Sequence, residues 1–372
     1  PHDKRKNLPD DMKPPRHVGL NYIDQGRLKV REQDSWIWGR RLERYEPLSQ
    51  SVYNGQDPTF LNARKLRIKK TNNDWIPNSR IYMGGSLLAP GEKVRPGVLS
   101  ATGVPVSDGN DNPYLIKDEL QGRRLAFAKW IANPKNPLTS RSIVNRVWQH
   151  HFGKPIVGNP NNFGAKGLKP THPDLLDWLA KDFVEHGWKF KRLHKMIMLS
   201  KTYMQSSSHP QFKELQTKDP ENNLFAYHLP RRLTADQIRD SLLKITGELN
   251  PLIGGLPMMS EINIEVALEP RMIQFSIAPA HQPSRTPKER NRRTLYAYRV
   301  RGQADPFLEI FNQPNPNDSC EARVSQSVTP QVFSLMNSDT ISDRSIALAL
   351  RVEKEMNTVP LQVKRAVQLT FG

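Results

Sequence analysis

Two kinds of sequence pattern divide the chain near Asp118. Before this residue, turn-forming pairs of Pro, Gly and Asn follow one another closely, and short pieces such as 79–83 and 93–95 show no sustained hydrophobic period. After it, apolar residues recur at helical spacing. We therefore predict a mainly α protein, with amphipathic helices, long Pro/Gly/Asn-rich loops and a few short strands. Residues 1–117 are expected to form a loop-rich N-terminal region, a linker or part of a preceding domain, and residues 118–372 a helical domain.

The clearest helical pattern runs from Ser140 to His151, and Thr139 or Ser140 is its expected cap. One side of this helix is apolar and the opposite side is polar. The apolar side holds Ile143, Val144, Val147, Trp148 and His151. The polar row consists of Arg141, Asn145 and Gln149, flanked by Arg146. The segment is therefore expected to pack on one side and to present amide and guanidinium groups on the other.

Later helices are predicted from their capping residues and from glycine and proline at their boundaries. Helix starts are expected at 171–174, where a capping-box variant occurs, near Lys189, at 234–237, where a second capping box occurs, and at 305–306 and 329–330, each a cap followed by a first-turn proline. Gly187 and Gly247 are expected to end the first and third of these helices. The tail, residues 338–371, holds two further helical patterns that break near Pro360. Two candidate strands lie at 261–266 and 272–277.

The composition limits the chemistry that this chain supports on its own. Lys and Arg number 55 against 37 Asp and Glu, which gives a formal net charge of +18. Cys320 is the only cysteine, so an intrachain disulfide, a zinc ribbon, an iron–sulfur cluster and covalent c-type haem are excluded. We therefore expect no cofactor and no metal in this chain, and we expect Cys320 to be a buried, inert thiol.

Two features bear on where the protein works. No apolar run approaches the roughly 18–20 residues that span a bilayer, so no transmembrane segment is expected. The chain begins at Pro1 rather than Met and stops at Gly372 after an apolar stretch. We expect a piece of a longer protein, truncated at its C-terminus, and the absence of a signal peptide does not place it in the cytoplasm.

Five of the ten histidines lie between His150 and His194, which raises the question of a metal site. His172 and His186 lie on one predicted helix about 21 Å apart, too far to share an ion. His150 and His151 are adjacent and point in different directions, and no His-Glu-x-x-His pattern occurs. We therefore favour a structural or hydrogen-bonded role for these residues over metal ligation.

The polar row Arg141, Asn145 and Gln149, with the adjacent His150, is the first candidate ligand site. An arginine fork and an asparagine amide suit a carboxylate, sulfate or phosphate. The alternative, which we favour, is a solvated face or one bonded to carbonyl groups of a neighbouring loop. The loop 159–167 has backbone amides that suit an anion nest, but a structural turn between helices is the favoured interpretation there.

Positive charge is prominent in two basic stretches, 64–70 and 288–301. The second contains Arg292 and Arg293 and interleaves arginine with aromatic residues such as Tyr296, as single-stranded nucleic-acid binders do. A sulfated or carboxylated polysaccharide, or an acidic partner domain, demands the same charge. Arg292 and Arg293 therefore join the candidate ligand contacts, and the composition does not separate the three kinds of partner.

A set of motifs spread from about Asp118 to the end resembles one known family. The motifs are Asn136 to Arg141, Asn145 to Gly153, Asn161 to Gly164, Thr171 to Leu179, Leu199 to Ser207, Arg231 to Ala235, Arg292 to Tyr296, Asn315 to Cys320 and Leu335 to Ser338. Together they resemble the planctomycete-type secreted domain family of unknown function DUF1553. The resemblance is specific because many separate motifs occur in the family's order.

The resemblance implies a context rather than a reaction. Domains of this family usually lie at the C-terminal end of large secreted bacterial proteins, behind a second uncharacterised domain and often a cytochrome-c-like haem module. A sugar-binding module is sometimes present. The resemblance therefore implies an extracytoplasmic location, in the periplasm or at the cell surface, and a haem-bearing companion domain. It assigns no catalytic residue, because no reaction is established for the family.

Three functions from different classes follow. The leading hypothesis is an extracytoplasmic module of a larger multidomain bacterial protein that binds or helps to process anionic polysaccharide, with electron transfer supplied by a separate haem domain. The second is a nucleic-acid-binding protein that uses residues 288–301, although nucleic acid is the less favoured partner. The third is an uncharacterised hydrolase with His150 or His172 as general base. The sequence leaves open whether the chain is an enzyme.

Overall fold

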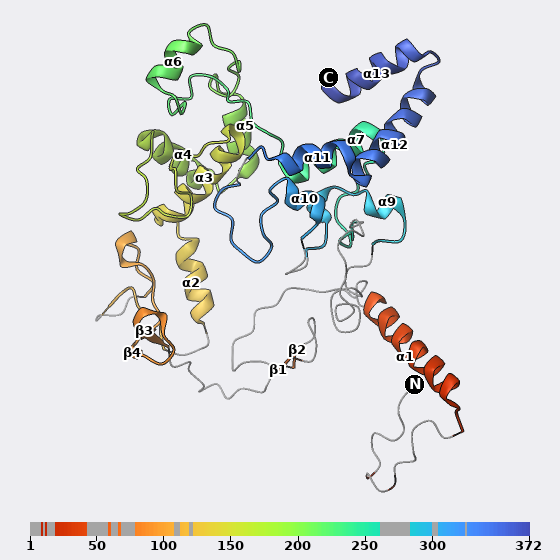
Figure 1. Cartoon of the computed structure of the whole chain (residues 1–372). Coiled ribbons are helices and arrows are strands. Elements are labelled where there is room, and N and C mark those ends of the chain that lie inside the picture. The colour runs from red at the N-terminus through yellow and green to blue at the C-terminus, as the bar shows by residue number, and fades with distance from the viewer. Residues whose placement is uncertain are drawn as a thin grey trace. The chain divides into compact units, whose positions relative to one another are not determined.

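The chain is mainly helical, as predicted. The computed structural model describes residues 19–42, 79–107, 112–118, 122–260, 283–299, 304–323 and 326–372, together with Pro9, Met12, 59–60 and 66–67. In this part of the chain, twelve α-helices make up most of the regular structure (Figure 1). The chain divides into a middle unit, Gln50–Arg232, and a terminal unit, Pro1–Ser49 with Leu233–Gly372. The domain boundary predicted at residue 117 falls inside the middle unit and stays a prediction.

The N-terminal region contains a long helix that contradicts the expectation of little regular structure before residue 117. Helix α1 spans Tyr22–Leu42. Polar and charged residues are spread around it, so no apolar period marks it in the sequence. Its start is capped, because the Asn21 side chain accepts a hydrogen bond from the Asp24 amide at 2.8 Å. The signal in the sequence was a capping residue followed by a long run without proline.

The strands are short, as predicted. Strand β1 (Thr59–Phe60) pairs antiparallel with β2 (Leu66–Arg67), and β3 (Arg80–Tyr82) pairs antiparallel with β4 (Pro90–Lys93). Each pair forms a sheet of two strands, which is too small to build a core of its own. The candidate strands at 261–266 and 272–277 lie outside the described residues.

Helices α3, α4 and α5 pack around the core of the middle unit. The helices of this unit in the described residues are α2 (Arg123–Ile131), α3 (Pro137–Phe152), α4 (Pro173–Glu185), α5 (Phe190–Met198) and α6 (Phe212–Lys218). The core contains Val144, Val147, Trp148, Phe152, Leu176, Leu179, Phe183, Leu193 and Ile197. These residues recur at helical spacing within each segment, so the apolar period read from the sequence is what brings the three helices together.

Helices α3 and α4 both begin with a proline in the first turn, and their caps differ from the predicted ones. Asn136 caps α3 by accepting a hydrogen bond from the Leu138 amide at 3.1 Å, so the prediction of Thr139 or Ser140 was wrong. His172 is the N-cap of α4 and forms no side-chain capping bond, so the predicted capping box is absent. Proline restricts the backbone angle φ to a helical value, and it marks both helix starts better than a capping side chain does.

Asn145 lies in the core of the middle unit, not on the outward polar side where the sequence pattern placed it. The residue is 0% exposed. Its amide nitrogen donates to the Val157 carbonyl at 3.1 Å, and its amide oxygen accepts from the Val157 backbone amide at 2.9 Å. One side chain therefore satisfies both backbone groups of a buried residue. This is the favoured alternative in which the row bonds to a neighbouring loop.

The loop 159–167 is a structural turn, as favoured from the sequence. The Asn159 side chain accepts a hydrogen bond from the Leu168 amide at 2.9 Å, which closes the loop across its base. Gly167 is required by close packing, because a Cβ at this position would lie 2.1 Å from the Asn162 carbonyl oxygen. The glycine therefore lets the two sides of the loop pack closely.

In addition to α1, the terminal unit contains the remaining α-helices of the described residues. They are α7 (Ala235–Thr246), α9 (Pro287–Arg290), α10 (Pro306–Ile310), α11 (Thr329–Asn337), α12 (Asp339–Glu355) and α13 (Val359–Phe371). Thr234 and Gln237 form the predicted capping box of α7, and Asp305 caps α10 as predicted. Helix α11 has Val328 as its N-cap instead of Thr329. Helices α12 and α13 are separated just before Pro360, which confirms the predicted break.

Replacing Asn145 by Ala is expected to lower the free energy of unfolding of the middle unit by about 2–4 kcal/mol, because the buried amide and carbonyl of Val157 would lose their partners. Tryptophan fluorescence during urea unfolding measures the change. Gln149→Ala, on the same helix but half-buried, is the control and is expected to change the free energy by less than about 0.5 kcal/mol. Equal effects of the two substitutions would contradict the role given to Asn145.

Candidate functional site

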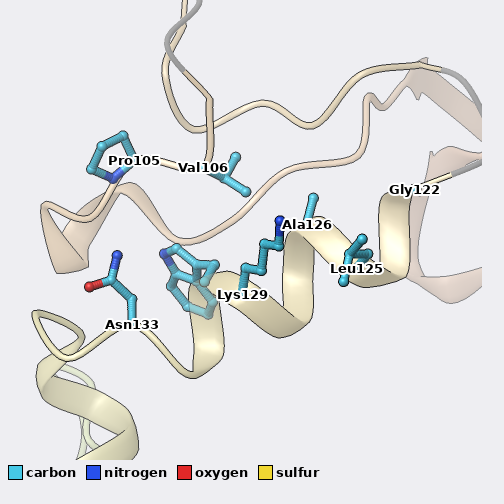
Figure 2. A pocket seen from close by; sticks show the side chains of 8 residues that line it. Pro105, Val106, Gly122, Leu125, Ala126, Lys129 and Asn133 are labelled. Carbon is cyan, nitrogen blue, oxygen red and sulfur yellow. The ribbon is translucent and has the colours of Figure 1, made fainter.

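A pocket of about 320 Å³ opens beside helix α2. Figure 2 shows its two walls. Leu125, Ala126, Lys129 and Asn133 lie along α2 and the turn that follows it, and Pro105 and Val106 lie on the loop opposite. Gly122 and Trp130 complete the lining. The volume and the mostly apolar lining are typical of small-molecule sites, which range over about 300–1,000 Å³.

Two buried hydrogen bonds hold the walls of this pocket in place. The Trp130 indole donates to the Val104 carbonyl at 3.0 Å, which joins α2 to the loop that carries Pro105 and Val106. Trp130 is only 7% exposed, so this bond is shielded from water. The Asn136 side chain donates to the Trp130 carbonyl at 3.1 Å and thereby joins the end of α2 to the start of α3. The pocket is therefore built on fixed elements.

The lining of the pocket combines apolar surface with two hydrogen-bond donors. Lys129 is exposed and extends from α2 toward the opposite wall (Figure 2). The Asn133 side-chain oxygen accepts a hydrogen bond from the Lys135 amide at 2.9 Å. The NH2 group of Asn133 forms no hydrogen bond with any of the described residues. An ammonium group and an amide donor beside apolar side chains and a proline ring suit a molecule with an apolar face and an anionic group.

The predicted polar row on α3 is taken up largely by internal contacts. Arg141 donates to Asp177 of α4 at 2.6 Å, so its anion is a carboxylate of the same unit. Asn145 is buried, as described above. The Gln149 side chain is half-buried and the His150 side chain is exposed. The row therefore does not offer four available groups to one ligand, and a ligand role for Gln149 and His150 stays a prediction.

Two histidines that the sequence did not pair meet between α3 and α5. His151 Nε2 lies 2.8 Å from His194 Nδ1, which is a hydrogen-bond distance. Burial lowers the pKa of His151, and the charges of His194, Arg231 and His150 lower it further. His151 and His194 therefore have the hydrogen-bonded role favoured from the sequence. Across the described ranges, no group of three or more His, Cys, Asp or Glu is placed to hold a metal ion.

Acidification is expected to weaken the middle unit through His151. Because the pKa of His151 is lowered in the folded protein, the unfolded chain binds the proton more tightly. The stabilising contribution is therefore complete above about pH 6.5 and is lost as the pH falls below this value. Urea unfolding at a series of pH values measures the loss, and His151→Gln is expected to reduce it. A variant with the pH dependence of the wild type would show that another group is responsible.

Arg292 is a structural residue of the terminal unit. It is 5% exposed. Its guanidinium group donates to the carbonyl oxygens of Leu252 at 3.2 Å, Leu256 at 2.5 Å and Gly254, and it lies over the Tyr296 ring at 4.2 Å from the centroid. The planar fork of one arginine thus holds a loop closed through several carbonyl groups. The Arg292 guanidinium group, which was predicted to contact an anion, is bonded to backbone carbonyl groups of this chain.

Two carboxylates of α7 neutralise other parts of the basic stretch. Arg293 lies 3.7 Å from Asp240. Asp236 accepts from Arg299 at 3.0 Å and also from Arg323. Burial raises the pKa of Asp236, but the hydrogen bond from Arg323 and the charges of Arg323 and Arg299 outweigh this and lower it below its usual value. The cations that suggested a nucleic-acid partner are therefore partly neutralised within the terminal unit.

Arg292→Lys is expected to lower the free energy of unfolding of the terminal unit by about 2–4 kcal/mol, because an ammonium group does not reach several carbonyl groups at once. Hydrogen exchange of residues 252–256, read by mass spectrometry, is expected to speed up. Arg293→Lys is the control, and its half-exposed ion pair predicts a change below about 0.5 kcal/mol. Unchanged exchange in Arg292→Lys would show that the loop is held by other contacts.

Cys320 differs from the expectation, and most of the first basic stretch lies outside the described residues. Cys320 is exposed, and its thiol donates to the Ala322 carbonyl at 3.3 Å, so the prediction of a buried thiol was wrong. It follows a run of short polar residues that forms turns at the surface. Of the basic stretch 64–70, only residues 66–67 are described.

The pocket residues carried no signal that sequence reasoning could use. Lys129 is an ordinary exposed residue of a helix, and Asn133 lies in the turn that follows this helix. Pro105 belongs to a loop that is separate in the sequence. The hydrogen bond from Trp130 to Val104 is what brings loop and helix together, and it is a tertiary contact that no local pattern encodes.

By its fold the chain is a mainly helical protein, and in the part that the structure describes no helix is long and apolar enough to cross a membrane. Residues 123–372 match the family model described as PSD1, Protein of unknown function (DUF1553), and the chain belongs to this family. The resemblance to DUF1553 is thus confirmed. The match begins at the first residue of α2, so it includes Lys129 and Trp130 but not Pro105. No curated protein and no solved structure matches the chain.

Proposed function

We propose that this chain is a binding module for anionic polysaccharide and that the pocket beside α2 takes one charged sugar of the polymer. The observation that carries the proposal is the lining, in which the ammonium group of Lys129 and the amide of Asn133 accompany Trp130 and Pro105. Sugar rings have apolar faces and polar edges, so the apolar lining with its proline ring and the amide donor of Asn133 are suitable contacts. The ammonium group favours a carboxylated or sulfated sugar over a neutral one.

Binding, rather than cleavage, is the activity that the lining supports. Hydrolysis of a glycosidic bond generally uses two carboxylic acids on either side of the bond. The described residues that line the pocket include no Asp, Glu, His, Ser or Cys. Among the described residues, the lining therefore offers groups that recognise a sugar but no pair of carboxylic acids for glycosidic cleavage.

The cellular context is a further part of the proposal. The family resemblance supports an extracytoplasmic location and a larger parent protein in which a separate haem module supplies electron transfer. Fractionation of the source cells, with a haem stain of the native polypeptide that contains this sequence, tests both ideas. A large, exported, haem-bearing product is expected. A haem-free cytoplasmic product near the 42.6 kDa of this chain would refute them.

Lys129→Gln is expected to weaken the binding of galacturonic acid oligomers at least about fivefold, because the variant loses the positive charge of the pocket and keeps a side chain of similar size. Isothermal titration calorimetry at low salt measures the affinity. Neutral galactose oligomers of the same length are expected to bind more weakly to the wild type, and equally to wild type and variant.

Lys135→Gln is the matched control. It removes the same charge from an exposed lysine that follows α2 and does not line the pocket. Its affinity for the acidic oligomers is expected to stay within about twofold of the wild type. Equal loss in both variants would mean that only the net charge matters. Unchanged affinity in Lys129→Gln would show that the pocket is not the site.

A further inference from the structure

Helix α5 presents an outward side that is both basic and apolar. Lys191 and Lys195 lie one turn apart, and Met198 and Leu199 follow on the same side. Met198 is 47% exposed and Leu199 63% exposed. The other side of the helix enters the core, where Leu193 is only 1% exposed. One side of the helix is thus packed in the core, and its outward side carries charged and apolar side chains together.

The same combination continues at both ends of the helix. Lys189 and Phe190 stand at its start, and Lys201 and Met204 lie in the turn that follows it. Phe190 is 49% exposed and Met204 64% exposed. We call the following residues the α5 surface: Lys189, Phe190, Lys191, Lys195, Met198, Leu199, Lys201 and Met204. Among the described residues, none of its four lysines forms a side-chain hydrogen bond or an ion pair.

Two carboxylates of α4, the helix that packs against α5, are paired with other groups. Arg192 binds Asp182 through two N–H groups, at 2.8 and 3.2 Å, and His186 lies 3.1 Å from the same carboxylate. Glu185 lies 3.8 Å from Lys181. These contacts use the one arginine of α5, so the charge of the α5 surface comes from its lysines, and these two acids do not cancel it.

We propose that the α5 surface docks the protein on an anionic lipid membrane. Positive charge alone would suit any polyanion, but the exposed Met and Leu side chains beside the lysines favour a partner that also has an apolar layer. A lipid surface supplies both partners, because lysines contact the phosphate headgroups while short apolar side chains reach the acyl boundary. The α5 surface shares no residue with the pocket beside α2, so the proposal does not rest on the proposed sugar binding.

Co-sedimentation of the full chain with vesicles tests the proposal. Vesicles of phosphatidylcholine mixed with phosphatidylglycerol are expected to bind the wild type, and vesicles of phosphatidylcholine alone are not. Lys191→Glu combined with Lys195→Glu is expected to lower the partition coefficient at least about tenfold. Lys166→Glu combined with Lys169→Glu makes the same change of charge on exposed lysines of a loop away from α5, and is expected to lower the partition coefficient at most about threefold.

A second variant distinguishes a membrane from a soluble polyanion. Met198→Ser combined with Leu199→Ser keeps every charge, and is expected to lower vesicle binding at least about threefold while binding to heparin stays unchanged. Circular dichroism confirms that each variant is folded. The proposal is overturned if the wild type does not sediment with anionic vesicles or if both lysine pairs have equal effects. It is also overturned if the serine variant binds vesicles like the wild type, since charge alone would then explain binding.

Discussion

The buried amide of Asn145 fixes the chain that leaves helix α3. It bonds both backbone groups of Val157, so Ile156 and Val157 can enter the core without leaving polar groups unsatisfied. The carbonyl of Ile156 then accepts the Thr171 amide at 3.0 Å, just before α4 begins. The placement of α4 against α3, and of α5 against both, therefore depends on one side chain in the middle of a helix. A hydrophobic residue of similar size could fill the same space, but it would leave two buried backbone groups without partners.

Arginine and lysine have different roles in the sites that the structure defines. The guanidinium groups of Arg292 and Arg141 are bonded to backbone carbonyls and to a carboxylate within their own units. Arginine suits such contacts because its planar fork satisfies several acceptors at once. Lys129 and Lys195, in contrast, extend from the helix surface and are exposed. At these sites, the positive charge that a partner can reach is therefore carried by lysine.

Some features of the fold could be predicted from the sequence and others could not, and the reasons are physical. Helices α4, α5 and α7 were predictable, because an apolar stripe that packs on one core repeats with the helical period. Helix α1 was missed, since nothing in its pattern distinguishes one side from another. Asn145 was assigned to the wrong side because residue type suggested solvent, whereas its burial depends on a loop that forms elsewhere in the chain. The pocket could not be predicted, since it forms between separate segments, which a hydrogen bond from Trp130 to Val104 joins.

In the proposed function an anionic sugar binds beside α2, whereas the arginines of α3 and of the basic stretch make contacts within their own units. Hydrogen–deuterium exchange with and without galacturonic acid oligomers tests this claim most directly, because it locates binding without any substitution. The prediction is slower exchange at residues 104–106 and 122–133, with exchange at 141–150 and 288–299 unchanged. Slower exchange confined to 288–299 or 141–150 would contradict the proposal and would show that the ligand binds at the arginines.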